Sequence, residues 1–131
     1  MGWRLAQLAD VPSTAAPGFW NEWAREPDYG ERWHSVGEHL GITGFGVNAY
    51  QADAGRELIV PHSETEFGGQ EELYIVTSGR ARFSCDGEPV EVAAGGLLHV
   101  THEVVREAVA LEDGTAIICV GGVPGQPYTP S

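Results

Sequence analysis

The chain has 131 residues, of which 42% are hydrophobic and 20% charged, and this composition is typical of a single soluble globular domain. Its 19 acidic and 7 basic residues give a formal net charge of -12, so we expect neither nucleic acid nor an anionic membrane surface as a partner, because both recruit Lys and Arg. Every basic residue is an arginine, and the lack of lysine excludes Schiff-base chemistry and a P-loop, since both need a lysine amine.

The two cysteines, Cys85 and Cys119, predict the cellular compartment. They do not have the spacing of a disulfide framework, and the sequence shows neither a secretory signal nor an apolar run long enough to cross a membrane. We therefore expect a cytoplasmic protein with free thiols, each of which serves as a small apolar strand residue, with a catalytic thiol as the alternative.

Residues 1–40 form a leader that holds all the tryptophans of the chain, at positions 3, 20, 23 and 33. Within this leader, residues 19–25 predict a short helix that ends before Pro27, with Phe19 and Trp23 on one face. Such aromatic residues are typical of an arm that packs over a barrel or a dimer partner. An aromatic wall for a ligand is the alternative.

From residue 42 onward the pattern becomes that of short strands separated by turns. The predicted strands cover residues 43–50, 57–60, 71–76, 80–85, 89–93, 97–101, 106–111 and 115–120. Asp86-Gly87 predicts a two-residue hairpin, and the three prolines of residues 124–131 predict an extended, exposed C-terminal tail. The pattern indicates an all-β jelly roll or small barrel over residues 41–123.

Residues 55–79 carry the chemistry. Strand side chains alternate between faces, so His62 and Glu64 point the same way, and so do Glu72 and Tyr74. If the strands at 57–60 and 71–76 pair across the intervening loop, one imidazole, two carboxylates and a phenol converge on one wall. Nitrogen and oxygen groups of this kind suit a divalent metal or proton transfer.

These residues resemble the two motifs of the cupin superfamily, whose fold is the double-stranded β-helix, a jelly-roll barrel. The first motif contains a Gly, a His-x-His pair, a Glu and a Gly, and its positions are taken here by Gly55, His62, Glu64, Glu72 and Gly79. The second motif has a Gly-Asp turn followed by Pro-x-Gly-x-x-His, and it corresponds to residues 95–96 and 101–106. The resemblance covers about residues 42–121 and leaves the leader outside.

The resemblance also implies a metal site, from which this sequence departs at two positions. His62 and Glu72 match family ligands, and Glu64 replaces the second histidine but can still ligate. Arg106 stands at the last histidine and cannot ligate, because a guanidinium stays protonated and offers no acceptor. His62, Glu64 and Glu72 could hold Mn, Fe or Zn, but an arginine aimed at them would repel a cation and pair with a carboxylate.

The remaining polar candidates have weaker support. We expect His99 on the surface and both leader histidines, at positions 34 and 39, in solvent. His102 is expected either in water or as a substitute ligand. Tyr74 either contacts a ligand or fills the barrel, and Asn48 and Tyr50 are expected on opposite faces of their strand.

Three functions remain open. The first is a metal-independent site in which Arg106 clamps a small anionic molecule, Tyr74 contacts it, and Glu72 or His62 acts as acid or base. The second is a divalent-metal-dependent oxygenase or isomerase that uses His62, Glu64 and Glu72. The third is a non-catalytic binding or dimerisation module. The resemblance implies a homodimer but cannot choose among these functions, because the fold hosts enzymes, sugar-binding regulators and storage proteins.

Overall fold

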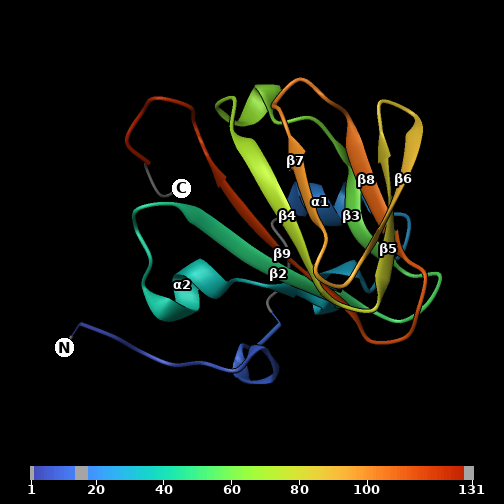
Figure 1. Cartoon of the computed structure of the whole chain (residues 1–131), viewed down its shortest axis with the longest axis horizontal. Coiled ribbons are helices and arrows are strands. Elements are labelled where there is room, and N and C mark those ends of the chain that lie inside the picture. Colours follow the sequence, from blue (N-terminus) through green and yellow to red (C-terminus); the bar gives the residue numbers. More distant parts are fainter. Residues whose placement is uncertain (1, 14–17, 129–131) are drawn as a thin grey trace.

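Two antiparallel sheets form the body of the protein in the computed structural model, which describes residues 2–13 and 18–128 (Figure 1). One sheet has five strands in the order β1-β2-β9-β4-β7, and the other has four in the order β3-β8-β5-β6. The strands are β1 (Trp33–His34), β2 (Gly46–Ala52), β3 (Glu57–His62), β4 (Glu71–Ser78), β5 (Arg80–Cys85), β6 (Glu88–Ala93), β7 (Leu97–Val100), β8 (Arg106–Ala110) and β9 (Thr115–Gly122). The predicted all-β jelly-roll barrel is confirmed.

The helical segments of the described residues are short. They are the α-helices α1 (Gly18–Trp23) and α2 (Val36–Leu40) and the 3-10 helices η1 (Leu8–Asp10), η2 (Tyr29–Arg32) and η3 (Thr65–Phe67). None of these is long and apolar enough to cross a membrane. Helix α1 corresponds to the helix predicted in the leader, but the side chain of Phe19, which was to share a face with Trp23, lies outside the described part of the chain.

Local sequence signals agree closely with the strands and turns of the barrel. The predicted hairpin at Asp86-Gly87 is confirmed, because both residues have the positive φ angles, 51° and 83°, that such a two-residue turn requires. In β5 the side chains of Ala81 and Phe83 are buried while Arg80 and Arg82 are outside. The alternation of this strand therefore directs its apolar side chains into the core.

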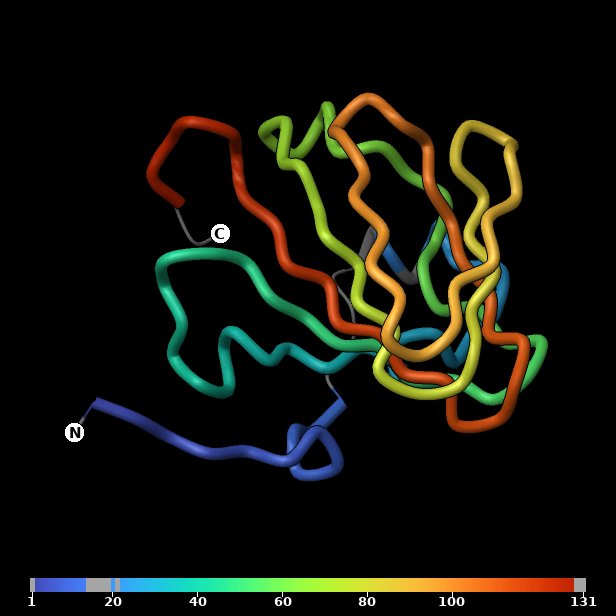
Figure 2. The backbone as a smooth tube through the Cα atoms, viewed as in Figure 1, coloured from blue at the N-terminus to red at the C-terminus, as the bar shows by residue number. Residues whose placement is uncertain are grey.

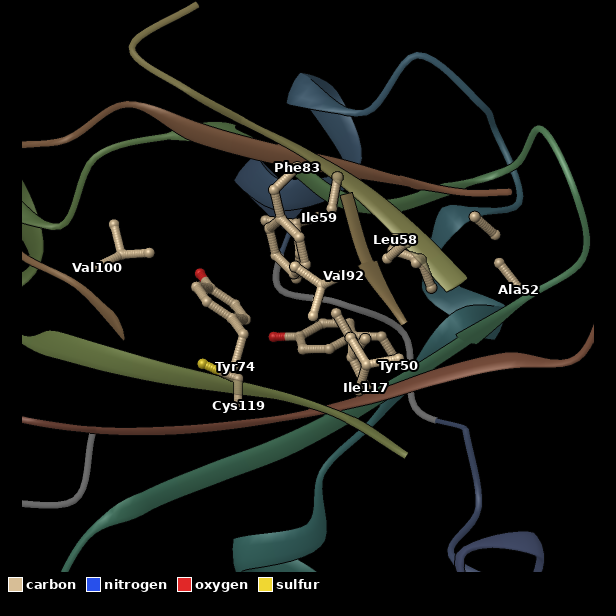
Figure 3. Packing of buried hydrophobic residues seen from close by; sticks show 14 residues of the cluster. Tyr50, Ala52, Leu58, Ile59, Tyr74, Phe83, Val92, Val100, Ile117 and Cys119 are labelled. Atoms are coloured by element: carbon tan, nitrogen blue, oxygen red, sulfur yellow. The ribbon is translucent and has the colours of Figure 1, made fainter. Parts of the chain in front are cut away.

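The core lies between the two sheets, and Figure 3 shows side chains from both of them in contact. Phe83 from the four-stranded sheet packs against Tyr74 from the five-stranded sheet, with ring centroids 5.1 Å apart. On β2, Tyr50 and Ala52 belong to this core, whereas Val47 packs near Gly37 of the leader. Both faces of β2 are consequently covered, one by the barrel and one by the leader.

The pairing of the strands on either side of residues 63–70 differs from the expected one. Strand β3 pairs with β8, and β4 pairs with β7 and β9, so β3 and β4 belong to different sheets. The hypothesis that they pair with each other is wrong, because both edges of β4 are already occupied. The connecting loop crosses from one sheet to the other and places His62 and Glu72 on facing walls.

The leader packs against the barrel of its own chain. In Figure 2 it passes behind the barrel at α1 and returns toward β2. Its strand β1 pairs with β2 and extends the five-stranded sheet. Trp20 and Tyr29 of the leader form a small buried cluster with Val60 of β3, while Trp3 stays 77% exposed.

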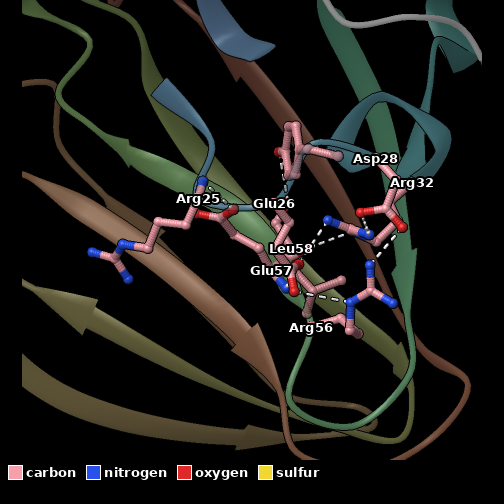
Figure 4. Close-up of polar contacts among 8 residues, drawn as sticks. Arg25, Glu26, Asp28, Arg32, Arg56, Glu57 and Leu58 are labelled. Carbon is pink, nitrogen blue, oxygen red and sulfur yellow. Dashed lines mark hydrogen bonds and ion pairs between the residues drawn. The ribbon is translucent and has the colours of Figure 1, made fainter. Parts of the chain in front are cut away.

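An ion network holds the leader to the start of β3 (Figure 4). Arg32 pairs with Glu26 at 2.7 Å and with Asp28 at 3.1 Å. Arg56 pairs with Glu26 at 2.9 Å and with Asp28 at 2.5 Å. Arg32 also donates to the main-chain oxygen of Glu57 at 2.9 Å, so the two arginines join the leader to the barrel.

The C-terminal residues match the expected extended, exposed tail only in part. Residues 124–127 are exposed, but a turn closed by the hydrogen bond from the Gln126 amide to the Val123 carbonyl replaces a straight tail. Tyr128 comes back to Gly46 of β2, and residues 129–131 lie outside the described part of the chain. The tail thus returns to the open end of the barrel.

We predict that Arg56→Ala loosens the leader in a pH-dependent way. Hydrogen bonds from Arg56 and Arg32 hold the pKa of Asp28 below its usual 3.8, so the pairing stabilises the fold at neutral pH and its contribution is lost as the pH falls through that lowered value. Thermal unfolding followed by tryptophan fluorescence should show a melting temperature a few degrees below wild type at pH 7. The gap should narrow as the pH falls below 3.8. Arg82→Ala, which removes an exposed arginine of β5, should leave the melting temperature unchanged. An equal fall in melting temperature in both variants would contradict the role of Arg56 in holding the leader to the barrel.

Candidate functional site

A cavity of about 410 Å³ opens between the two sheets. The leader, the two sheets and the returning tail all contribute to its walls. Its aromatic lining consists of Trp20, Tyr29, Trp33, Tyr50, Phe67, Tyr74 and Tyr128. Its polar and thiol lining consists of Asn48, His62, Glu64, Gln70, Glu72 and Cys119.

His62 is fixed at the end of β3 with one ring nitrogen directed toward Glu64. Its Nδ1 lies 2.7 Å from the Val60 carbonyl oxygen, and since a carbonyl only accepts, Nδ1 carries a proton. Trp20 packs against the imidazole in a T-shaped arrangement with ring centroids 4.6 Å apart. Nε2 lies 2.9 Å from Glu64 Oε2, a distance at which the two atoms share one proton. Glu64 and His62 therefore form a proton-sharing pair at the cavity.

Glu72 faces this pair from β4 and is held by two neutral donors. The Tyr74 hydroxyl donates to Oε1 at 2.7 Å, and the Cys119 thiol donates to Oε2 at 3.2 Å. Burial and then the Glu72 charge raise the pKa of Cys119, and burial, Cys119 and Glu72 raise the pKa of Tyr74. Both groups consequently keep their protons, and Glu72 keeps its role as acceptor.

Arg106 lies behind the carboxylates and is fully buried, with 0% exposure. It is the register partner of His62 across the β3–β8 pair. Its Nη2 donates to the Thr101 carbonyl at 2.7 Å, and its Nη1 lies 3.5 Å from Glu72 Oε1 and 3.9 Å from Glu64 Oε2. The expected ion pairs are confirmed, but Arg106 is not among the residues that line the cavity.

The donor atoms of His62, Glu64 and Glu72 suit a divalent metal in kind. They all lie within 4.8 Å of one another, and ligands at 2.0–2.2 Å from one ion are at most about 4.4 Å apart, so a small shift at most would be needed. The guanidinium of Arg106 acts against such an ion, because a fixed positive charge beside the donors lowers their affinity for a cation. The chemistry of the donors therefore fits a metal, and the charge around them opposes it.

The other histidines lie away from the cavity walls. His99 is exposed on the outer face of β7 and pairs with Glu71 at 2.7 Å. His102 is exposed at the rim, where its Nδ1 lies 3.1 Å from Thr65 Oγ1, and it does not reach the cavity as a substitute ligand. His39 is exposed as expected, whereas His34 is half-buried and its Nδ1 donates to a main-chain oxygen, so the expectation of a solvated side chain is wrong there.

The structure adds cavity residues that the sequence did not single out. Asn48 and Tyr50 both line the cavity, so the expectation that they lie on opposite faces is wrong, since residues two apart in a strand share a face. Gln70 joins them from the loop before β4. Within the described residues, none of these three side chains makes a hydrogen bond, so all are available to a ligand. The period of two in β2 was the signal that could have identified the pair.

Comparison with known proteins rests on structure. No protein-family model matches the chain, and no curated protein matches it in sequence. A cupin protein from Bacteroides fragilis is similar over 73% of this chain and 80% of that chain, with 26% identity and a TM-score of 0.62. KdgF from Halomonas sp. matches 61% of this chain and 69% of that chain, with 21% identity and a TM-score of 0.53. An RmlC-like cupin protein from Desulfovibrio desulfuricans matches 61% and 73%, with 20% identity and a TM-score of 0.52.

We predict that Arg106→Ala destabilises the protein most at neutral pH. Removing one partner of a buried ion pair leaves Glu64 and Glu72 without their counter-charge, and such a loss costs about 3–5 kcal/mol of unfolding free energy. The deficit should shrink toward acid pH as the carboxyl groups take up protons. Urea unfolding at two pH values measures both effects. Arg82→Ala on the exposed face of β5 should change the free energy by less than about 0.5 kcal/mol. A deficit of Arg106→Ala that does not depend on pH would refute the counter-charge role.

Proposed function

This chain belongs to the cupin superfamily, and we propose that its barrel binds a small molecule without a metal, with His62 and Glu64 as a proton-transfer pair. The observation that carries the proposal is the fully buried Arg106, which lies 3.5 Å from Glu72. A guanidinium at this place provides the positive charge that two neighbouring carboxylates require. Because Arg106 already provides this positive charge, the two carboxylates do not need a divalent ion to balance them.

The proposed chemistry is proton transfer to or from a bound molecule. His62 and Glu64 already share a proton across 2.9 Å, so either can exchange it with a ligand that displaces the other. Glu72 accepts hydrogen bonds from Tyr74 and Cys119 and has acceptor capacity left for the ligand. The volume of about 410 Å³ lies within the range of small-molecule sites in proteins.

The geometry does not support the expected clamp of Arg106 on an anionic ligand. Arg106 is absent from the cavity walls, and its nearest charged neighbours are Glu64 and Glu72, which line the cavity themselves. An anion in the cavity would meet these carboxylates before it met the guanidinium. We therefore assign Arg106 to the positioning of the carboxylates, and a neutral or positively charged ligand replaces the anionic one in our proposal.

A divalent-metal enzyme is the second candidate, and the spacing of His62, Glu64 and Glu72 within 4.8 Å favours it. In that case these three residues would hold Mn, Fe or Zn, and the ion would act as a Lewis acid on an oxygen of the substrate. The activity would then be that of an oxygenase or an isomerase. The positive charge of Arg106 would lower the affinity for the ion, so the three ligands would have to bind it strongly enough to overcome this repulsion.

A non-catalytic module that binds a ligand or a second copy of the chain is the third candidate. The homodimer that the family resemblance implies stays a prediction. Trp20 is buried within its own chain, whereas Trp3 and Trp23 have exposed side chains, at 77% and 43%. Light scattering at micromolar concentration measures the mass, and a monomer would refute the dimer.

We predict that Mn²⁺ or Zn²⁺ leaves the melting temperature of the wild type nearly unchanged. A ligand that binds only the folded state at 100 times its Kd adds about 2.7 kcal/mol to the unfolding free energy, which would raise the melting temperature by several degrees. Arg106→His removes the opposing charge and adds a donor, so this variant should show such a rise. Adding Glu72→Gln to Arg106→His should abolish the rise. A metal-dependent rise in the wild type would instead establish the second candidate.

A further inference from the structure

We infer that the cavity selects a small organic cation, namely an amine or quaternary ammonium group on an apolar body. This inference rests on the proposed binding of a small molecule in the barrel and adds the chemical class of that molecule. Three features of the walls lead to it: their charge, their aromatic rings and one tyrosine hydroxyl that makes no hydrogen bond to the described residues.

The distribution of charge around the cavity favours a positively charged ligand. Glu64 and Glu72 are the only acidic residues on the described walls, and none of the described arginines is on them. Because His62 and Glu64 share a proton, Glu72 is the wall carboxylate without a cationic partner on the wall, and Arg106 lies behind it. A cation in the cavity can approach Glu72 without displacing the arginine. The net charge of -12 on the whole chain also attracts cations toward the molecule.

Aromatic rings make up the largest group of wall residues, and the leader supplies three of them, Trp20, Tyr29 and Trp33. Trp20 stacks on Phe67 with ring centroids 5.3 Å apart and packs against His62 in a T-shaped arrangement. The faces of aromatic rings attract cations through their quadrupole, and this attraction strengthens when the cation loses its water. Walls of this type, combined with carboxylates, bind an ammonium group better than a neutral group of the same shape.

Tyr50 provides an independent indication of a ligand. It is 6% exposed, it lines the cavity, and its hydroxyl makes no hydrogen bond to any described residue. Burial raises its pKa well above 10, so the hydroxyl stays neutral and can accept a hydrogen bond from an ammonium group. Figure 3 shows the hydroxyl groups of Tyr50 and Tyr74 on the same side of the barrel. Because Tyr50 lines the cavity and its hydroxyl has no partner among the described residues, the hydroxyl is free to bond to a ligand there.

A series of probes that differ in charge but hardly in shape tests the inference on the wild-type protein. Calorimetric titration with benzylamine, benzyl alcohol and benzoate at pH 7 and constant ionic strength compares a cation, a neutral molecule and an anion. Tetramethylammonium tests a cation that cannot donate a hydrogen bond. We expect benzylamine to bind at least tenfold more tightly than benzyl alcohol, and benzoate to bind more weakly than both.

The outcomes separate this inference from the proposed function. If benzyl alcohol or benzoate bound as tightly as benzylamine or more tightly, the inference that the cavity selects a cation would be overturned. The proposed metal-independent small-molecule site would still stand. Failure of both cations to bind at about 10 mM would also overturn it. Binding of any probe only after addition of Mn²⁺ or Zn²⁺ would refute the proposed function itself.

Two pairs of variants locate the effect. Glu72→Gln removes a wall charge, whereas Glu71→Gln removes the neighbouring charge on the outer face of β4, where it pairs with His99. Benzylamine affinity should fall at least tenfold in Glu72→Gln and stay unchanged in Glu71→Gln, with little change for benzyl alcohol in either. Equal affinities in the two variants would contradict the inference.

The second pair tests the aromatic wall. Trp20→Leu replaces a wall ring by an aliphatic side chain, and Trp3→Leu makes the same change at a residue that is 77% exposed. Tetramethylammonium should bind several-fold more weakly to Trp20→Leu and with unchanged affinity to Trp3→Leu. Thermal unfolding establishes that each variant is folded. If Glu72→Gln does not fold, the probe series and this second pair decide the question.

Discussion

The buried positive charge of Arg106 is the constraint on which the site depends. A guanidinium with no exposure needs negative partners, because burying an unpaired charge costs several kcal/mol. Glu64 and Glu72 are those partners, and they come from opposite sides of the barrel. The arginine therefore joins the two sheets electrostatically at the point where the cavity begins. The carboxylates direct their remaining acceptor capacity toward His62, Tyr74 and Cys119.

The barrel alone does not complete this cavity. Trp20, Tyr29 and Trp33 of the leader form part of its wall, so the position of the leader decides the shape of the site. That position is maintained by apolar packing against Val60 and by the ion network of Arg32 and Arg56. The ion pairs are part-exposed and the aromatic cluster is buried, so apolar packing contributes most of the stabilisation of the docked leader. The ion pairs fix where the leader sits against the start of β3. Binding and the docking of the leader are thus physically coupled.

Much of the fold could be predicted because its signals are local. The alternation of Ala81 and Phe83 with arginines and the hairpin at Asp86-Gly87 depend only on neighbouring residues, since side-chain direction has a period of two and the turn needs two positive φ angles. The nearness of His62 and Glu64 is local as well, and the replacement of a ligand by Arg106 is visible from the motif alone. The sequence could therefore name the charged residues of the candidate site, but not the polar and aromatic side chains, such as Asn48, Tyr50 and Gln70, that complete its wall.

The all-β class, the turns and the charged residues of the site follow from local patterns, whereas their positions relative to one another depend on how the barrel closes. Strand partners are not encoded in a strand's own pattern, so the predicted pairing of β3 with β4 was wrong, and facing sheets bring His62 and Glu72 together instead. The same holds for Arg106, whose side chain lies behind the carboxylates rather than on the wall. Hydrogen bonds between distant strands and the burial of charge depend on contacts far apart in the chain, and these exist only once the barrel has closed.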